Sequence, residues 1–124
     1  MTLDPEYEVL FYERPDGESP TRRFLSALPV KARAKIGKWI ELLAIHGPNL
    51  PRPYADTVLG KIRELRVQTD GMSYRLLYFF AGKKIVITHG FVKKTDKVPV
   101  EELNRAVRFM NDFLDLLQRG ETKK

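Results

Sequence analysis

The hydrophobic positions in the first half of the chain predict one strand followed by two helices. A β-branched and aromatic run over residues 7–12 favours a strand, and turn residues follow it directly. Ser19 before Pro20 is typical of a helix N-cap and a first helical position, so we expect a short helix there. A longer helix is predicted over residues 29–46, because its apolar residues recur at helical spacing. These residues are Ile36, Trp39, Ile40 and Leu43.

The pattern in the second half predicts three strands and a final helix. A proline-rich segment at 48–60 is expected to be a loop, and strands are predicted over residues 61–68, 73–80 and 84–91. Short turns with glycine join the three strands, which should therefore form an antiparallel meander. Pro99 begins a last helix with apolar residues along one face.

These elements predict an α+β fold with the order β-α-α-β-β-β-α, in which an antiparallel sheet packs on helices. The 124 residues have the length of one domain, which we expect to span residues 1–124. The polar tail at 119–124 is expected to fray.

Composition narrows the class of protein. Hydrophobic residues make up 43% and charged residues 31% of the chain, as in folded globular proteins. No apolar run approaches the roughly 20 residues that span a bilayer, and the acidic N-terminus lacks the character of a signal peptide. The absence of cysteine excludes disulfides and thiolate chemistry. We therefore expect a cytoplasmic protein.

The positive charge is concentrated in one segment. Residues 61–97 hold nine basic and three acidic residues, which equals the whole net charge of +6. The other 87 residues hold 13 of each sign. A local excess favours a polyanionic partner such as nucleic acid, although a solvated strand face gives the same count.

Strand alternation gathers charged side chains on one face of the predicted sheet. Leu65 and Val67 suit the core, so Glu64 and Arg66 project from the opposite face. Arg75, on the next strand, is offset by one from its core neighbours and joins them. With two residues at the end of the last strand, the predicted face gathers Glu64, Arg66, Arg75, His89 and Phe91.

Basic residues flank this face at both ends. Lys61 and Arg63 stand at its entrance, but strict alternation points them away from Glu64, so they reach the face only through a bulge or an irregular strand start. Lys93 and Lys94 continue beyond the end of the last strand.

These residue types fit the cleavage of RNA by its own 2′-hydroxyl group. Such a site orients the hydroxyl, removes its proton, stabilises the charged phosphate and protonates the leaving 5′-oxygen. Arginine forks match phosphate oxygens, a glutamate or histidine serves as base, and a histidine or lysine serves as acid. Phe91 would stack on an RNA base. The sequence holds no metal-ligand spacing and no glycine-rich phosphate loop, so no metal or other cofactor is expected.

Each of these residues also has a structural explanation. Glu64 beside arginines is also explained as a surface ion pair worth under about 1 kcal/mol. His89 is also explained as a structural histidine, and Phe91 as a core residue or the cover of a sheet edge. Only the gathering of these residues on one predicted face favours the catalytic explanation over the structural one.

The segments "GKIRELRV", "YRLLYFF" and "HGFVKKTDKVP", followed by "EELNRA", resemble the RelE/ParE toxin superfamily, in particular its HigB-like, phage-derived Gp49-like branch. The resemblance spans nearly the whole chain. It implies an endoribonuclease that enters the ribosomal A site and cuts mRNA without a metal, leaving a 2′,3′-cyclic phosphate. It also implies a cognate antitoxin, usually a helix-turn-helix protein, whose complex with the toxin binds operator DNA.

The resemblance assigns roles to individual residues. Arg75 would clamp the scissile phosphate, and Glu64 beside Arg66 would be the base. His89 matches a position used for acid or base work in some members. Some members use a late tyrosine where this chain has Phe91, which cannot transfer a proton, so proton transfer falls to His89 or a lysine. The further basic residues would grip RNA; they are Lys61, Arg63, Lys93 and Lys94.

Two other functions remain open on the same fold. One is a toxin that poisons DNA gyrase, as in the ParE branch, which needs no acid and base. The other is a binding module without chemistry, whose basic face docks on RNA or an acidic protein.

Overall fold

The computed structural model describes residues 4–120 and has an α+β fold. Residues 121–124 of the tail that was expected to fray lie outside the described residues. Arg119 and Gly120, the first two residues of that tail, form a turn after the last helix. A short 3₁₀ turn, Gly47–Asn49, follows α2. The elements in chain order are β1 (Glu8–Phe11), α1 (Pro20–Ser26), α2 (Val30–His46), β2 (Ala55–Leu59), β3 (Ile62–Thr69), β4 (Met72–Ala81), β5 (Lys84–Val92) and α3 (Val100–Gln118).

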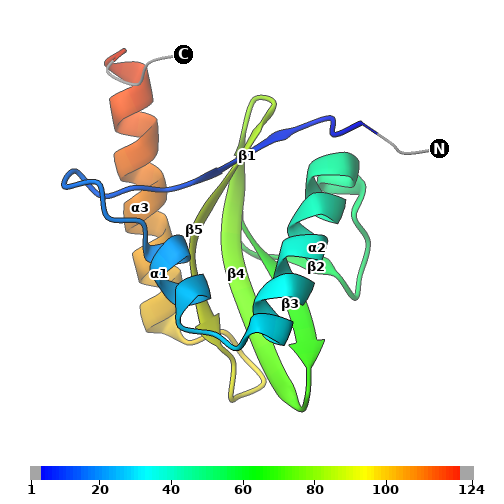
Figure 1. Ribbon diagram of the computed structural model, residues 1–124. Coiled ribbons are helices and arrows are strands. Elements are labelled where there is room, and N and C mark those ends of the chain that lie inside the picture. Colours follow the sequence, from blue (N-terminus) through cyan, green and yellow to red (C-terminus); the bar gives the residue numbers. More distant parts are fainter. Residues whose placement is uncertain (1–3, 121–124) are drawn as a thin grey trace.

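The sheet corrects two of the sequence predictions. It has five strands in the order β1-β5-β4-β3-β2, and β2 lies inside the segment that was expected to be a loop. The three central strands form the predicted antiparallel meander, but β1 pairs with β5 in parallel, so the sheet is mixed. After β1 the chain passes through α1, α2 and three further strands before it forms β5, which runs parallel to β1 at the other side of the crossover (Figure 1).

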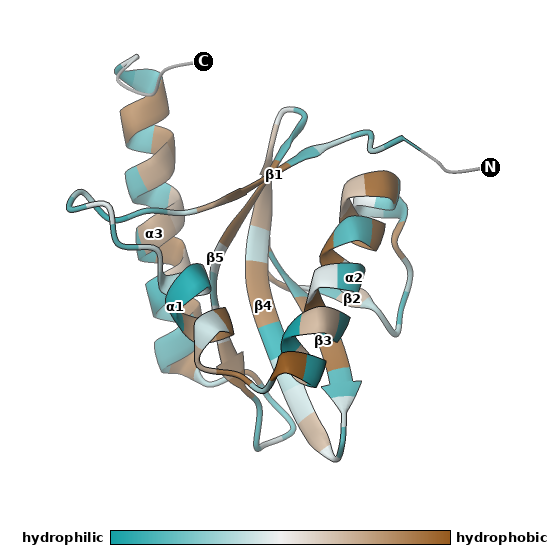
Figure 2. Cartoon of the chain, viewed as in Figure 1, coloured by the Kyte–Doolittle hydropathy of each residue, from teal (hydrophilic) through white to brown (hydrophobic). Residues whose placement is uncertain are grey.

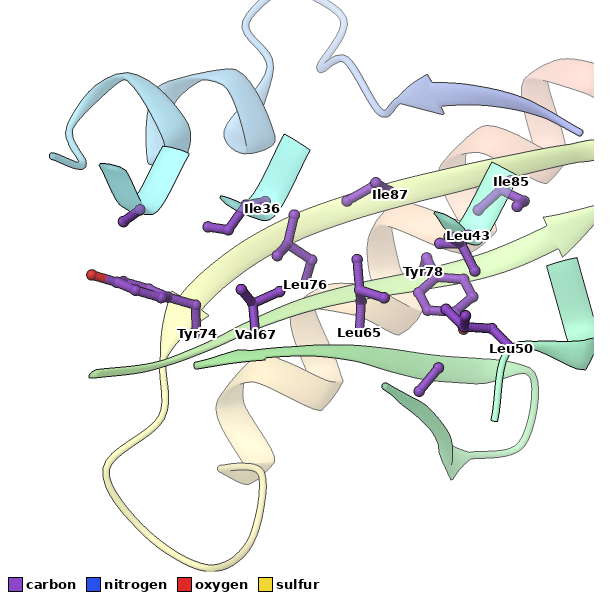
Figure 3. Close-up of a cluster of buried hydrophobic side chains, with 12 residues drawn as sticks. Ile36, Leu43, Leu50, Leu65, Val67, Tyr74, Leu76, Tyr78, Ile85 and Ile87 are labelled. Carbon is purple, nitrogen blue, oxygen red and sulfur yellow. The ribbon is translucent and has the colours of Figure 1, made fainter. Parts of the chain in front are cut away.

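Helices α1 and α2 cover one face of the sheet. The N-cap of α1 forms as predicted, with Oγ of Ser19 accepting a hydrogen bond from the Arg22 N–H at 3.2 Å. Helix α2 buries Ile36 and Leu43, which point toward the strands in Figure 3. Helix α1 lies so close to β5 that a Cβ on Gly90 would stand 2.4 Å from the Phe24 ring.

Helix α3 covers part of the other face. Its hydrophobic and hydrophilic residues lie side by side along its length in Figure 2, as expected for a helix with one buried side. Ala106 and Phe109 are its buried residues, and Phe109 stacks on Tyr12 with ring centroids 4.6 Å apart. The Tyr12 hydroxyl donates a 2.6 Å hydrogen bond to Asp112, so the end of β1 is fastened to the middle of α3. No helix within residues 4–120 has the length and hydropathy needed to cross a membrane.

Candidate active site

Glu64 lies between two arginines on the α3 side of the sheet. Its Oε1 atom is 3.0 Å from Nε of Arg75, and its Oε2 atom accepts a 2.9 Å hydrogen bond from Nε of Arg66. Only 4% of Glu64 and 8% of Arg75 is exposed, whereas Arg66 reaches solvent. The contact between Glu64 and Arg75 is an ion pair that lacks the geometry of a hydrogen bond. Within the described residues, the buried Oε1 atom of Glu64 and the buried Nε atom of Arg75 have no hydrogen-bond partner.

The strand register explains why these three side chains meet. Arg66 of β3 lies directly opposite Arg75 of β4, and Glu64 is two residues before Arg66. Opposite residues of an antiparallel ladder share a face, with Cβ atoms about 5 Å apart. Leu65 and Val67 alternate with the charged residues and are fully buried against α2. The structure therefore brings together the three residues that strand alternation had placed on one face.

Arg75 is the most firmly held of the three. Its Nη1 atom donates to Oγ of Ser73 at 2.6 Å and to the carbonyl of Tyr74 at 3.2 Å. Burial lowers the pKa of Arg75, the Glu64 carboxylate opposes that effect, and Arg66 adds to it. The pKa of arginine ordinarily lies far above neutral pH, so the group remains a cation at neutral pH. The result is a fixed positive charge at the bottom of the site.

Arg66 belongs to a chain of ion pairs that the sequence did not reveal. Its Nη2 atom is 3.3 Å from Asp56 of β2, and Arg52 contacts the same carboxylate at 3.0 Å. Burial raises the pKa of Asp56, but the Thr57 N–H, Arg52 and Arg66 outweigh it and hold the pKa below its usual value. Asp56 was missed because the segment around it was taken for a loop.

A cleft of about 360 Å³ opens beside the two arginines at the edge of the sheet. Its walls include Arg66 and Arg75 from the strands, Lys35 and Trp39 from α2, and Tyr54 from the segment before β2. The Trp39 and Tyr54 rings lie 5.8 Å apart, and Nζ of Lys35 lies 5.1 Å from the Trp39 ring. The cleft thus combines guanidinium groups with partly exposed aromatic surface, which is what single-stranded nucleic acid requires.

Phe91 lies directly opposite Arg75 in the sheet but does not offer a stacking surface. It is 8% exposed and belongs to the cluster of buried residues beneath α3. The geometry suited to base stacking is found instead at Trp39 and Tyr54. The sequence pattern points to neither residue as a stacking surface, because Trp39 occupies a core position of its helix and Tyr54 lies among prolines.

An irregularity in β5 turns His89 and Phe91 toward α3. Ile87 points to the α2 side, and strict alternation would place His89 and Phe91 beside it. The β4–β5 register shifts at Thr88, which has no partner residue on β4, and its hydroxyl lies 3.2 Å from the carbonyl of Leu77. Such a bulge re-aims the residues that follow it. His89 shares a face with Glu64 only because of Thr88.

His89 is buried under the first turns of α3. It is 1% exposed, and its Nε2 atom lies 2.9 Å from Oε1 of Glu102, while Nδ1 lies 3.1 Å from Oγ1 of Thr88. A carboxylate only accepts, so Nε2 carries the proton of the neutral ring. Burial lowers the pKa of His89 and Arg105 lowers it further, against the opposing effect of Glu102. His89 is therefore a neutral, enclosed group in this structure.

The first turns of α3 divide the predicted face into two hollows. On one side, Leu103 of α3 borders a hollow of about 320 Å³ together with Glu64 and Lys93. On the other side, Arg105 borders a hollow of about 240 Å³ that has His89 in its wall. The sequence-predicted site is thus split, with Glu64 and His89 in different hollows.

The flanking basic residues also separate. Lys93 lines the hollow of Glu64, whereas Lys94 is exposed beyond the end of β5. Arg63 stays on the opposite face of β3, with its Cζ atom 5.7 Å from the Phe80 ring, and Lys61 lies in the turn before β3. The register shift next to Arg63 lies in β2, between Thr57 and Leu59, and does not turn Arg63 toward Glu64. Lys61 and Arg63 therefore do not stand at the entrance to the Glu64 site.

Within residues 4–120, no three histidine, cysteine or carboxylate side chains gather as metal ligands would. A search of curated proteins gave no match. The model of the family described as phage derived protein Gp49-like matches residues 23–111, which include the sheet from β2 to β5, all of α2 and the Glu64 cluster. This match covers well over half of the chain, and the chain belongs to that Gp49-like family, which is the family of HigB-like, RelE-type toxins.

Proposed function

We propose that this protein is the toxin of a type II toxin–antitoxin system and that it cuts mRNA on the translating ribosome. The family supports the toxin class. The observation that carries the cleavage is the Glu64 carboxylate, which is held by two arginines that also line a cleft with aromatic walls. A base, two phosphate ligands and a stacking surface are parts that RNA cleavage by the 2′-hydroxyl uses, together with a general acid.

The scissile phosphate would draw Arg66 away from Glu64. Both oxygens of Glu64 contact a guanidinium group in the free protein, so the carboxylate is a poor base as long as those contacts last. A phosphodiester offers two oxygens in the geometry that arginine prefers. Arg66 is the more exposed of the two and would exchange its contacts with Glu64 and Asp56 for the phosphate, whereas Arg75 is fixed by Ser73. Substrate binding therefore frees the Oε2 atom of Glu64 at the site of the reaction, while Arg75 stays in place.

The reaction then proceeds in one displacement. The 2′-oxygen attacks phosphorus and forms a new P–O bond, while its proton passes to the Glu64 carboxylate. The P–O5′ bond breaks, and its electron pair leaves on the 5′-oxygen, which takes a proton from a general acid. Arg66 and Arg75 stabilise the charge on the equatorial oxygens. The products are a 2′,3′-cyclic phosphate and a 5′-hydroxyl end.

We assign the role of general acid to Lys93, the more buried of the two lysines that line the hollow of Glu64. It lines the same hollow as Glu64, and its ammonium group carries protons to donate. His89 lies across α3 in the other hollow, enclosed and neutral, and reaches Glu64 only if α3 moves. We therefore assign proton donation to Lys93. His89 instead has a positioning role, because its contact with Glu102 holds α3 in place.

The same proposal assigns the partners. The substrate is mRNA in the ribosomal A site, and the ribosome supplies part of the positioning. A cognate antitoxin, of the helix-turn-helix type that the resemblance implies, keeps the toxin inactive and carries the complex to operator DNA. Translation places these events in the cytoplasm.

The test is induced expression of the wild type, Arg75→Ala and Lys38→Gln in bacteria, followed by growth curves and mapping of mRNA 5′ ends. Lys38 is an exposed lysine on the outer side of α2, so Lys38→Gln removes one positive charge away from the site. We expect the wild type and Lys38→Gln to arrest growth and to produce new 5′-hydroxyl ends within coding regions. Arg75→Ala should do neither, while circular dichroism shows that it is folded.

Two results would contradict the proposal. Growth arrest with intact mRNA and accumulated gyrase–DNA cleavage complexes would identify a gyrase poison. Normal growth of cells that contain folded wild-type protein, together with salt-sensitive RNA binding, would identify a binding module without chemistry. The more exposed Arg66→Gln serves as a second variant if Arg75→Ala does not fold.

A further inference from the structure

A second group of arginines gathers on the other side of α3 from Glu64. Arg14 from the loop after β1, Arg23 from α1 and Arg105 from α3 all line the 240 Å³ hollow that has His89 in its wall. The three residues are up to 91 positions apart in the sequence, and all of them lie outside the basic segment at 61–97. The fold alone brings them together.

A carboxylate bridges two of these arginines in the way a phosphate would. Oε1 of Glu18 lies 3.3 Å from Nε of Arg14, and Oε2 of Glu18 lies 2.5 Å from Nη1 of Arg23. The two guanidinium groups are thus spaced to receive two oxygens of one anion. The backbone holds this spacing, because the Arg14 N–H donates to the Glu18 carbonyl at 2.8 Å and closes a tight turn. The arrangement repeats the one in which Glu64 bridges Arg66 and Arg75.

Glu18 is a weak occupant of this position. Its side chain is 37% exposed, and that of Arg23 is 78% exposed. Exposed ion pairs of this kind contribute little to stability. A phosphate bound by arginine forks makes stronger, charge-assisted hydrogen bonds. An incoming phosphate therefore displaces Glu18 at little cost.

The positive charge around the hollow also favours the binding of an anion. The guanidinium groups of Arg14, Arg105 and Arg108 lie 5.2, 5.6 and 5.7 Å from the centroid of one ring, that of Phe109. Cation–π contacts hold each of them, but three like charges around one ring repel one another. Glu18 pairs with Arg14 and Glu102 pairs with Arg105, and a bound anion beside these two arginines would reduce the repulsion further.

We propose that Arg14, Arg23 and Arg105 form a second phosphate-binding site, which takes a phosphate group of an RNA backbone. Helix α3 separates it from Glu64, and a helix with its side chains is about 10–12 Å thick, so the two sites bind different phosphates. The site does not rest on the proposed cleavage, because it needs neither the 2′-hydroxyl nor Glu64.

The first experiment uses inorganic phosphate as the probe. In ¹H–¹⁵N NMR spectra of the arginine side chains, phosphate should cause saturable shifts at Arg14, Arg23 and Arg105. Sodium chloride at matched ionic strength should not, and Arg119, which pairs with Asp115 at the end of α3, provides an internal control. Equal responses to phosphate and chloride would overturn the proposal.

The second experiment uses a fluorescent, 2′-O-methylated RNA of about 12 nucleotides, a length within the range of single-strand sites. It cannot be cut, because its nucleophile is blocked, so binding is measured apart from cleavage. The slope of log K against log salt is negative for the wild type. Its magnitude should decrease by about 0.7 in Arg14→Gln and by a similar amount in the separate variant Arg105→Gln. The control Lys38→Gln should keep the wild-type slope.

The two experiments together identify the source of the phosphate. Saturable phosphate shifts with a reduced RNA slope support an RNA site. Phosphate shifts with an unchanged RNA slope would overturn the assignment to RNA and leave a site for free phosphate. Arg23→Gln, which changes a 78% exposed side chain, replaces any variant that does not fold.

Discussion

Nε2 of His89 lies 2.9 Å from Oε1 of Glu102, and this contact fastens the first turn of α3 across the face of the sheet. The same turn separates the hollow of Glu64 from the hollow of His89. The histidine that the sequence pattern favours as a catalytic group therefore holds in place the helix that keeps it from the reacting centre.

The stability of the protein should depend on the protonation of His89. Burial and Arg105 lower its pKa below 6.5, so the unfolded chain binds the proton more tightly than the folded protein does. The stabilisation is fully present above about pH 6.5 and is lost as the pH falls from there through the folded-state pKa. Urea unfolding from about pH 7.5 to about pH 5.5 should show a falling free energy of unfolding.

Two histidine variants isolate this effect. In His89→Gln, most of the decrease in the free energy of unfolding from about pH 7.5 to about pH 5.5 should disappear, although the variant is less stable than the wild type at neutral pH. His46→Gln changes the other histidine, which is exposed, and should keep the wild-type pH dependence. Equal pH dependence in His89→Gln and the wild type would mean that other groups cause it.

Replacing Glu64 by glutamine should separate binding from cleavage. Glu64→Gln removes the base and also the negative charge that competes with RNA phosphate for Arg66 and Arg75. We expect cleavage to be lost while uncleavable RNA binds at least as tightly as to the wild type. The free energy of unfolding should fall by about 1–3 kcal/mol, because the arginines lose a charged partner. A variant that still cuts mRNA would exclude Glu64 as the base.

Trp39, rather than Phe91, should support RNA binding through stacking. Trp39 lines the cleft beside Arg66 and Arg75, whereas Phe91 is buried under α3. Trp39→Leu should weaken RNA binding by about 1–3 kcal/mol, the usual contribution of one stacked base. Fluorescence anisotropy measures this loss.

Phe91→Leu is the matched control for that experiment. It should lower the free energy of unfolding by about 1 kcal/mol and leave the RNA affinity of the folded protein unchanged. A larger loss of affinity in Phe91→Leu than in Trp39→Leu would reverse the assignment.

The same substitution at two glycines should have opposite effects on stability. A Cβ at Gly90 would lie 2.4 and 2.6 Å from two atoms of the Phe24 ring, so Gly90→Ala forces α1 away from β5. We expect a loss of about 1–3 kcal/mol. A Cβ added to Gly37, in the middle of α2, would meet no atom of the described residues within 4 Å beyond its own helix backbone and chain neighbours. Gly37→Ala should therefore stabilise the protein by up to about 1 kcal/mol, as thermal or urea unfolding will show.

The fold was predictable where the signal was local. Helix starts at Ser19 and Pro99 and the three strands of the meander follow from short-range patterns, and the structure has them within a few residues. Strand β2 was missed because it is a short edge strand that follows three prolines and pairs on one side only. The parallel pairing of β1 with β5 joins segments far apart in the sequence, and no local pattern specifies it.

The candidate site divides in the same way. By itself the sequence determined that Glu64, Arg66 and Arg75 share a face, because alternation of side chains is a property of the extended backbone. Only the tertiary structure decided the rest. The bulge at Thr88 re-aimed His89, α3 then enclosed it, and long-range packing assembled the second arginine group around Arg14 and Arg105. These outcomes depend on which segments pack together, and that is settled by the burial of the whole core rather than by any single stretch of the chain.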